Sequence, residues 1–327
     1  RSPRRLRTCR VRLDPMSAST PIDRRNPEPD RQRDRGSGKF QRQQHQLGGL
    51  ASVNNLESTA TASRITETFV GRNAIVELDD ASLTGIATTA TGAPMANALI
   101  DAASGSVGVS VSNLKTTATV GDGSGQSSNT RAYIDQNSNL SAGHVSLSAT
   151  SDTTVSADVT SSEAGGLAAS SSTDITAKAA HDTEVFVADN VDMTLTGALD
   201  MTATGTSTAS PQSKGLGVAG GLSLGSATVV TELASDTRAS IGEDGEITAT
   251  SIDLDATGVH TATAAALNTG VAGLASISAL DVTSKDTGSA EIRHRRARIR
   301  RHPGHDQDHN DLGRHRSRRR SAVQCQL

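Results

Sequence analysis

The amino-acid sequence predicts an all-β fold, a parallel β-helix (β-solenoid), for residues 46–292. Three observations predict it. The chain of 327 residues has one Tyr, three Phe and no Trp, which is too few rings for the core of a compact domain of this length. Its residues recur in tandem units of about 53 residues, and apolar and polar residues alternate within each unit. Small apolar residues in repeated layers suit a thin core whose layers contact only their neighbours.

The two ends of the chain differ sharply from this central region. Residues 46–292 carry 8 Lys and Arg against 27 Asp and Glu, a net charge of −19, whereas the ends together carry +16. Residues 1–45 are rich in Arg and Pro, residues 293–327 are rich in Arg and His, and neither end has strand or helix periodicity. We therefore expect both ends to be disordered.

Two explanations of these basic ends stay open. They are either genuine tails or out-of-frame translation of the same repeat DNA, because a GC-rich repeat read one base off yields many Arg, His, Pro and Gln codons. We favour the second explanation. Translation of the coding DNA in the other two frames tests it, and the hypothesis fails if neither frame continues the repeat.

The cysteines and the opening residues bear on the compartment. Cys9 and Cys325 both lie in the ends, so the central region must be stabilised without disulfides. No run of 18 apolar residues is present, and we expect no transmembrane helix. The residues that follow Arg1 lack the apolar run of a signal peptide, and we interpret the chain as a fragment of a longer exported protein.

The repeat is clearest at a set of apolar landmark positions. Ile134, Val187, Ile241 and Ile292 lie 53, 54 and 51 residues apart, and a looser first copy leads to Val70. Apolar residues also recur at matching distances after each landmark: Leu140, Val145 and Leu147; Met193, Leu199 and Met201; Ile247, Ile252 and Leu254.

Within each unit, the alternation is that of strands with one buried face. Ile252, Leu254 and Ala256 would be buried while the residues between them face solvent, and we expect Leu222 and Leu224 to be buried in the same way. Turns are expected at Gly, Asn and Asp clusters, and strands of about 4–7 residues would then give two or three windings per unit, or roughly 10–13 windings in all.

Two stretches carry a resemblance to a known class of proteins. Gly217–Val230 (GVAGGLSLGSATVV) and Ile247–Gly258 (ITATSIDLDATG) resemble repeats of giant bacterial surface adhesins of the filamentous-haemagglutinin-like and autotransporter types. The resemblance implies a parallel β-helix stalk at the bacterial cell surface, exported across the outer membrane by machinery that lies outside this chain. It implies a structural or adhesive role without catalysis, with surface glycans or proteins of host or neighbouring cells as partners.

Two alternative functions are weighed against this one. A β-helix enzyme acting on polysaccharide would need clustered carboxylates, basic residues and aromatic sugar platforms, but the central region offers few rings (Phe69, Tyr133, Phe186) and eight basic residues. An ice-binding or cation-binding solenoid would need the same short motif in every winding. Thr202-Ala-Thr204 and Thr261-Ala-Thr263 suggest such an array but do not align with the other units.

Several short motifs fit catalytic or cofactor-binding patterns by chance, in our interpretation. Gly215–Gly220 has the glycine spacing of a dinucleotide-binding loop, but strand-like sequence follows it where a helix would be needed. Gly221–Gly225 has the nucleophile-elbow pattern around Ser223. The histidines that could serve it as a base occupy non-equivalent places in separate units (His144, His181 and His260).

We also interpret the short metal-binding patterns of the sequence as chance matches. Asp253 and Asp255 could hold a cation on a strand face, Gly121–Gly125 is the nearest approach to a calcium loop, and His305 and His309 have i, i+4 spacing without an evident third ligand. The sequence thus predicts no catalytic, cofactor-binding or metal-binding residue. It leaves weak, diffuse calcium binding open, and the acidic central region is not expected to bind nucleic acid.

Overall fold

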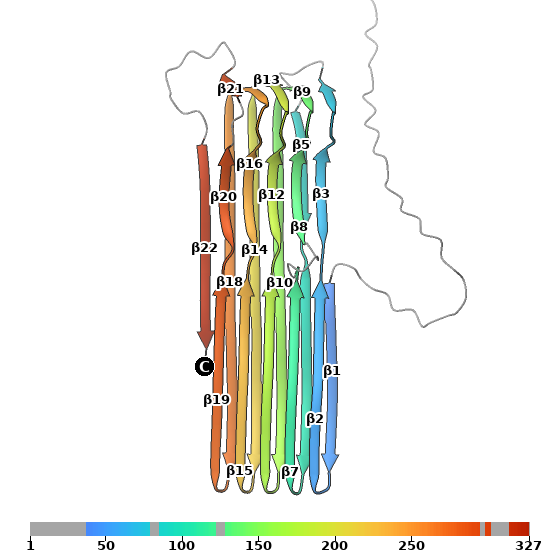
Figure 1. Ribbon diagram of the computed structural model, residues 1–327, viewed down its shortest axis with the longest axis vertical. Helices are drawn as coiled ribbons and strands as arrows, with labels where there is room; N and C mark the ends of the chain where they lie inside the picture. The colour runs from blue at the N-terminus through green and yellow to red at the C-terminus, as the bar shows by residue number, and fades with distance from the viewer. Residues whose placement is uncertain (1–36, 79–84, 122–127, 295–297, 302–313, 327) are drawn as a thin grey trace, which may run out of the picture. The chain divides into compact units, whose positions relative to one another are not determined.

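The computed structural model describes residues 37–78, 85–121, 128–294, 298–301 and 314–326. All regular elements in these ranges are β-strands, and every strand pair is parallel. The fold is therefore all-β with parallel strands in stacked sheets, as expected, and it is compatible with a β-solenoid (Figure 1). The candidate metal pair His305 and His309, and residues 122–125 of the candidate calcium loop, lie outside the described residues.

One passage of the chain visits four sheets in order. In the central passage, β10 (His144–Gly165) lies in the long sheet, β11 (Ala168–Ala179) in the second sheet, β12 (Asp182–Val187) in the third and β13 (Asp192–Leu195) in the fourth. The chain then returns to the long sheet as β14 (Ala198–Ala219), directly beside β10. Each passage thus adds one strand to every sheet, and in one passage the strand of the long sheet is divided into two.

The other passages repeat this order. The long sheet also contains β1 (Ser37–Gly48), β5 (Gly85–Gly92), β6 (Met95–Ser106), β18 (Ser251–Ala272) and β22 (Arg314–Gln326). The second sheet contains β2 (Ala51–Ala62), β7 (Val109–Val120), β15 (Leu222–Leu233) and β19 (Ala275–Asp286). The third contains β3 (Ile65–Val70), β8 (Asn129–Ile134), β16 (Asp236–Ile241) and β20 (Ser289–His294), and the fourth contains β4 (Ile75–Glu77), β9 (Asn139–Ala142), β17 (Glu246–Ala249) and β21 (Arg298–Arg301).

The strand register shows how long one winding is. In the third sheet, Asp182 neighbours Asp236, which neighbours Ser289, and these positions lie 54 and 53 residues apart in the chain. The expectation of two or three windings within one repeat unit is wrong, because a single passage through all four sheets uses the whole unit. It failed because strands of about 4–7 residues were expected, whereas β10, β14 and β18 each run for 22 residues.

The landmark positions pair as the sequence predicted, with one exception. Ile134 pairs with both Val70 and Val187, and Val187 pairs with Ile241. Ile241 then pairs with His294, so Ile292 lies two positions away from its expected place, opposite Ala239.

Strands also occur within the two ends for which we expected disorder. β1 pairs with β6, and β21 and β22 pair with β17 and β18. For these residues the structure corrects the expectation of disorder, because an edge strand presents unpaired N–H and C=O groups that accept another strand of almost any composition. Residues 1–36 and 302–313 lie outside the described part of the chain, and out-of-frame translation stays a hypothesis.

Two prolines interrupt the long strands. Pro94 lies between β5 and β6, which pair with consecutive parts of β10. Pro211 lies in β14, whose pairing with β18 stops at Ala209 and resumes at Gln212. Proline has no N–H to donate to the ladder, so each proline locally breaks the hydrogen-bonded pairing.

A left-handed residue recurs in the turn between the third and fourth sheets. Asn73, Asn137, Asn190 and Asp244 occupy this turn in successive windings, with φ of 57°, 57°, 55° and 58°. Among non-glycine residues, Asn and Asp tolerate this conformation best. The backbone N–H groups of the three asparagines donate to carbonyls of the next winding, at 3.0, 3.3 and 2.9 Å, so the turns stack as regularly as the strands.

The core is thin and built from small apolar side chains. One cluster lies where the long sheet meets the third and fourth sheets, and a second lies between the long and second sheets. Ile252, Leu254 and Ala256 are buried as predicted. The alternation that buries them continues through the long strands, so each winding adds a similar layer to the core.

Where the long sheet turns into the second sheet, the larger apolar residues point outward and the small or polar residues between them point inward. Leu222 and Leu224 are 37% and 39% exposed while Ser223 between them is 2% exposed, so the prediction that both leucines are buried is wrong. The turn has only two residues, and a Cβ on Gly165 would collide with the carbonyl oxygen of Ala168. Because the two sheets approach so closely there, only small side chains fit inside, and larger aliphatic ones lie outside.

Candidate functional site

The glycine motifs of the sequence serve packing. Gly215 and Gly217 lie inside β14, and strand β15 follows where a nucleotide-binding loop would need a helix. A Cβ on Gly217 would come within 2.8 Å of the Ser223 hydroxyl oxygen. Ser223 donates a hydrogen bond to the carbonyl oxygen of Gly217 at 3.4 Å. Both residues lie beside the turn between the long and second sheets, which we call the turn end, where the interior of the fold is narrow. A buried hydroxyl in a strand cannot act as an exposed nucleophile.

Two of the three candidate histidines are buried within the fold. His181 has Nδ1 at 2.7 Å from the Ser128 hydroxyl and Nε2 at 3.0 Å from that of Thr130. Burial, together with the positive charge of Arg64, lowers the pKa of His181 to about 4. His260 contacts Asp286 at 3.0 Å, with side chains only 1% and 4% exposed. Both rings thus have partners inside the fold and are shielded from solvent.

In the structure, the Asp and Thr-Ala-Thr motifs do not line up into the cation-binding or ice-binding arrays that the sequence analysis considered. No group of three or more His, Cys, Asp or Glu that could hold a metal occurs within the described ranges. Asp253 lies opposite Asp200, and Thr202 lies opposite Asp255. The threonine pairs of β14 and β18 therefore do not stack into one continuous row.

The outer face of the third sheet carries a different feature, an aromatic ladder. Phe69, Tyr133 and Phe186 occupy the same position of β3, β8 and β12. The ring centroids of Phe69 and Tyr133 are 5.1 Å apart, those of Tyr133 and Phe186 are 4.7 Å apart, and the planes of the latter pair differ by 5°. Parallel pairing without a register shift stacks identical positions, so three of the four aromatic residues of the chain meet.

A ladder of alternating charge runs beside the aromatic one. Glu67, Arg131, Glu184, Arg238 and Glu291 occupy equivalent positions of the five strands of the third sheet. Nε of Arg131 lies 2.7 Å from a carboxylate oxygen of Glu184, and Arg238 lies 3.6 Å from the other oxygen. Each acidic residue has a basic neighbour, so the row is electrostatically matched along the sheet.

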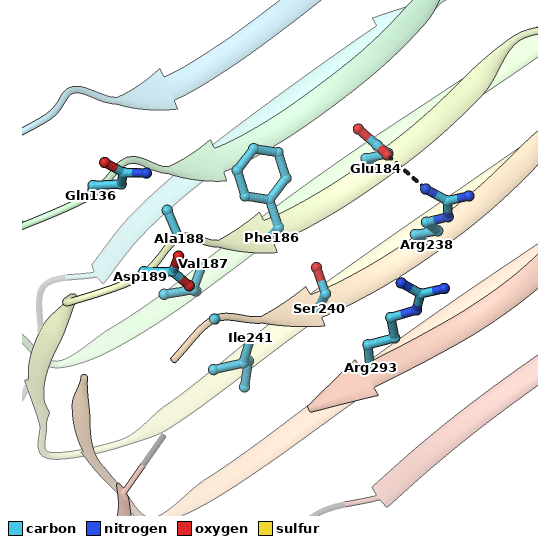
Figure 2. Close-up of a pocket in the computed structure, with 11 residues that line it drawn as sticks. Gln136, Glu184, Phe186, Val187, Ala188, Asp189, Arg238, Ser240, Ile241 and Arg293 are labelled. Carbon is cyan, nitrogen blue, oxygen red and sulfur yellow. Dashed lines mark ion pairs between the residues drawn. The ribbon is translucent and has the colours of Figure 1, made fainter. Parts of the chain in front are cut away.

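A cavity of about 340 Å³ lies at the end of the aromatic ladder. Figure 2 shows Phe186 and Ser240 on adjacent strands, with Arg293 on the strand beyond and Glu184 paired with Arg238 at the rim. Gln136 and Asp189 complete the polar lining from the neighbouring turns. We call this cavity the ring slot and regard it as the candidate functional site.

The turn end carries a second, apolar hollow. It has a volume of about 450 Å³ and lies on the long sheet, between Leu47 on one side and Leu216 and Val218 on the other. Gly105 and Ala164 line the space between them. The hollow follows from the inverted alternation, which places leucine and valine outside and small residues inside.

Sequence reasoning missed the ring slot, although a signal for it was present. The three ladder rings directly precede the aligned landmarks Val70, Ile134 and Val187. Equivalent positions of consecutive units are direct neighbours only if each unit forms a single winding. Because two or three windings per unit were expected, the stacking of these rings was not predicted.

Comparison with known proteins gives no match to a family model, a curated protein or a solved structure. Within the part of the chain that the structure describes, no helix has the length and hydropathy of a membrane span.

Proposed function

We propose that the chain is a structural and adhesive stalk segment of an exported bacterial surface protein, without catalysis. In this proposal the fold is a parallel β-helix made of tandem units of about 53 residues, which is the separation between Asp236 and its neighbour Ser289. The register supports it, because Val145, Leu199 and Ile252 are neighbours in successive windings. Such a fold grows by adding windings that contact only their neighbours, which suits a protein part that spans distance.

The observation that carries the adhesive part of the proposal is the outer face of the third sheet. Successive windings place aromatic and charged side chains there in continuous rows. Tyrosine and arginine side chains, both present in these rows, are among the residues that most often anchor a partner. Repeated rows favour multivalent contact with glycans or proteins of a host or neighbouring cell, while export would depend on machinery outside this chain.

The experiment locates the protein and measures its adhesion. Antibodies against the chain should label intact producing cells, and external protease should remove the label. Beads coated with the full chain should adhere to target cells more than beads coated with a matched acidic protein. Label found only after lysis, or coated beads that adhere no better than the control, would contradict the proposal.

A β-helix enzyme acting on polysaccharide is the second candidate, because Glu184 and Asp189 both line the ring slot. Glu184 is paired with two arginines, and Asp189 accepts a hydrogen bond from the backbone N–H of Glu243 at 2.8 Å. These contacts support structural roles for both carboxylates. Release of reducing sugar from a polysaccharide panel, lost in Glu184→Gln, would favour the enzyme.

A further inference from the structure

The aromatic ladder ends after Phe186, although the row of equivalent positions continues. Ser240 lies opposite Phe186 on the next strand, and Arg293 lies opposite Ser240 on the strand after that. A serine side chain is too short to continue the stack. The space above it is the ring slot, which is open between the ring of Phe186 and the side chain of Arg293 (Figure 2).

The dimensions of this space suit one ring. Two strand spacings separate the rows of Phe186 and Arg293, which amounts to about 9.5 Å. A ring placed midway would lie about 4.8 Å from each neighbour, close to the 4.7 Å between the centroids of Tyr133 and Phe186. A saturated six-membered ring is thicker than an aromatic one and would contact both neighbours at that separation.

The chemistry of the rim favours a ring that carries hydroxyl groups. Arg238 contacts Asp236 at 2.6 Å and Arg293 contacts Glu291 at 2.6 Å, so an ion pair orients each guanidinium group beside the slot. With Glu184, Asp189 and Gln136, they offer donors and acceptors around the edge of the ring. An aromatic ligand would shield the remaining donors and acceptors of these groups from water and offer them no new partners, which costs affinity.

We propose that the ring slot binds one pyranose unit of a glycan. The C–H face of the sugar stacks on Phe186, and its hydroxyl groups bond to the rim residues. The inference rests on the proposed adhesive function for its biological purpose and names the class of partner that this function would use.

The test titrates the full chain with methyl α-D-glucopyranoside, methyl α-D-mannopyranoside and methyl β-D-galactopyranoside, with p-cresol as the aromatic comparison. Tyr133 is the only tyrosine in a chain without tryptophan, and it lies one rung from the slot. Its fluorescence can therefore follow glycoside binding through Phe186, whereas p-cresol shares the tyrosine chromophore and is followed by saturation-transfer NMR. At least one glycoside should bind with a Kd on the order of millimolar, and saturation-transfer NMR should place the sugar C–H protons against the protein.

Three variants separate slot binding from other effects. Ser240→Phe adds a fourth ring that occupies the slot, and it should weaken sugar binding roughly tenfold or more by exclusion. Ser278→Phe, at an exposed position of β19 in the second sheet, is the matched control and should bind as the wild type does. Phe186→Ala should weaken binding about three- to tenfold through lost stacking, with circular dichroism confirming that each variant is folded.

Some outcomes would overturn the inference. These are a wild-type chain that binds no glycoside, a folded Ser240→Phe variant that binds as well as the wild type, and binding of p-cresol alone. Adhesion of coated beads without glycoside binding would remove this inference and leave the proposed function standing. Glycoside binding by a protein that never reaches the cell surface would do the reverse.

Discussion

Single buried residues set how the fold responds to pH. Glu163 has its side chain in the narrow interior of the turn end, where it is only 3% exposed. Burial raises the pKa of its carboxyl to about 7, and the nearby hydroxyls of Ser112 and Ser171 oppose the shift. His181 shows the opposite case, because burial keeps its imidazole neutral far below the usual pKa.

Replacing Glu163 by Gln should stabilise the protein at alkaline pH. The folded pKa of about 7 exceeds the ordinary value of 4.5, so between these values the folded chain holds a proton that the unfolded chain has lost. Stability therefore falls as pH rises through this window. Glu163→Gln should remove the fall and gain up to about 3 kcal/mol at pH 8. Urea unfolding across pH 4–9 measures it, with the exposed Glu57→Gln as control.

Replacing His181 by Asn should remove a loss of stability in acid. The folded pKa of about 4 lies below the ordinary value of 6.5, so the unfolded chain binds a proton first as pH falls, and stability decreases from about pH 6.5 to 4. His181→Asn should be less stable at pH 7 by about 1–2 kcal/mol, because hydrogen bonds are lost, but its acid loss should shrink. An unchanged acid slope of the urea midpoint, compared with exposed His144→Asn, would refute this.

At the scale of elements, the turn between the third and fourth sheets decides how the strands stack. Its Asn or Asp holds a left-handed backbone in four windings. An alanine there would have its Cβ close to the following carbonyl oxygen without the short polar side chain by which Asn and Asp offset that cost, whereas glycine has no Cβ.

Asn137→Ala should therefore lower the free energy of unfolding by about 1–2 kcal/mol, whereas Asn137→Gly should change it by less than about 0.5 kcal/mol. Chemical denaturation of the purified variants measures both. Asn139→Ala, on the exposed side of β9, is the matched control and should have little effect. Equal losses in the Ala and Gly variants would show that the side chain matters and the backbone conformation does not.

At the scale of the whole molecule, the length of one winding is the central quantity. Deleting residues 145–198 removes one complete passage and leaves Leu199 in the place of Val145, its partner in the register. The shortened chain should fold, because the remaining strands find equivalent neighbours. A modest loss of stability is expected, since Arg131 would then lie beside Arg238.

A deletion of half that length should not be tolerated. Removing residues 145–171 takes out most of β10 and the start of β11, which leaves β14 without β10, one of its two partner strands. Far-UV circular dichroism and protease resistance should show a β-fold for the deletion of a whole winding and an unfolded or aggregated chain for the deletion of half a winding. The opposite pattern would mean that the unit contains two windings.

The candidate site shows which parts of the structure could be predicted. The equivalence of Phe69, Tyr133 and Phe186 was visible in the aligned units, and parallel pairing turned that equivalence into a stack. The ring slot could not be predicted, because it depends on Ser240 and Arg293 falling in the same row. Arg293 lies in the end of the chain for which the sequence predicted disorder.

The sequence by itself determined that the chain is all-β, with a thin aliphatic core and a tandem repeat, because alternation and recurrence are properties of the order of residues. Only the tertiary structure decided where the windings turn and which face lies inside at the turn end. Both depend on how closely two sheets approach each other. Alternation shows that every second side chain is buried, but only the distance between the sheets decides which of the two sets of side chains fits inside. Leu222 and Leu224 lie outside for this reason, while Ile252 and Leu254, farther from the turn, lie inside.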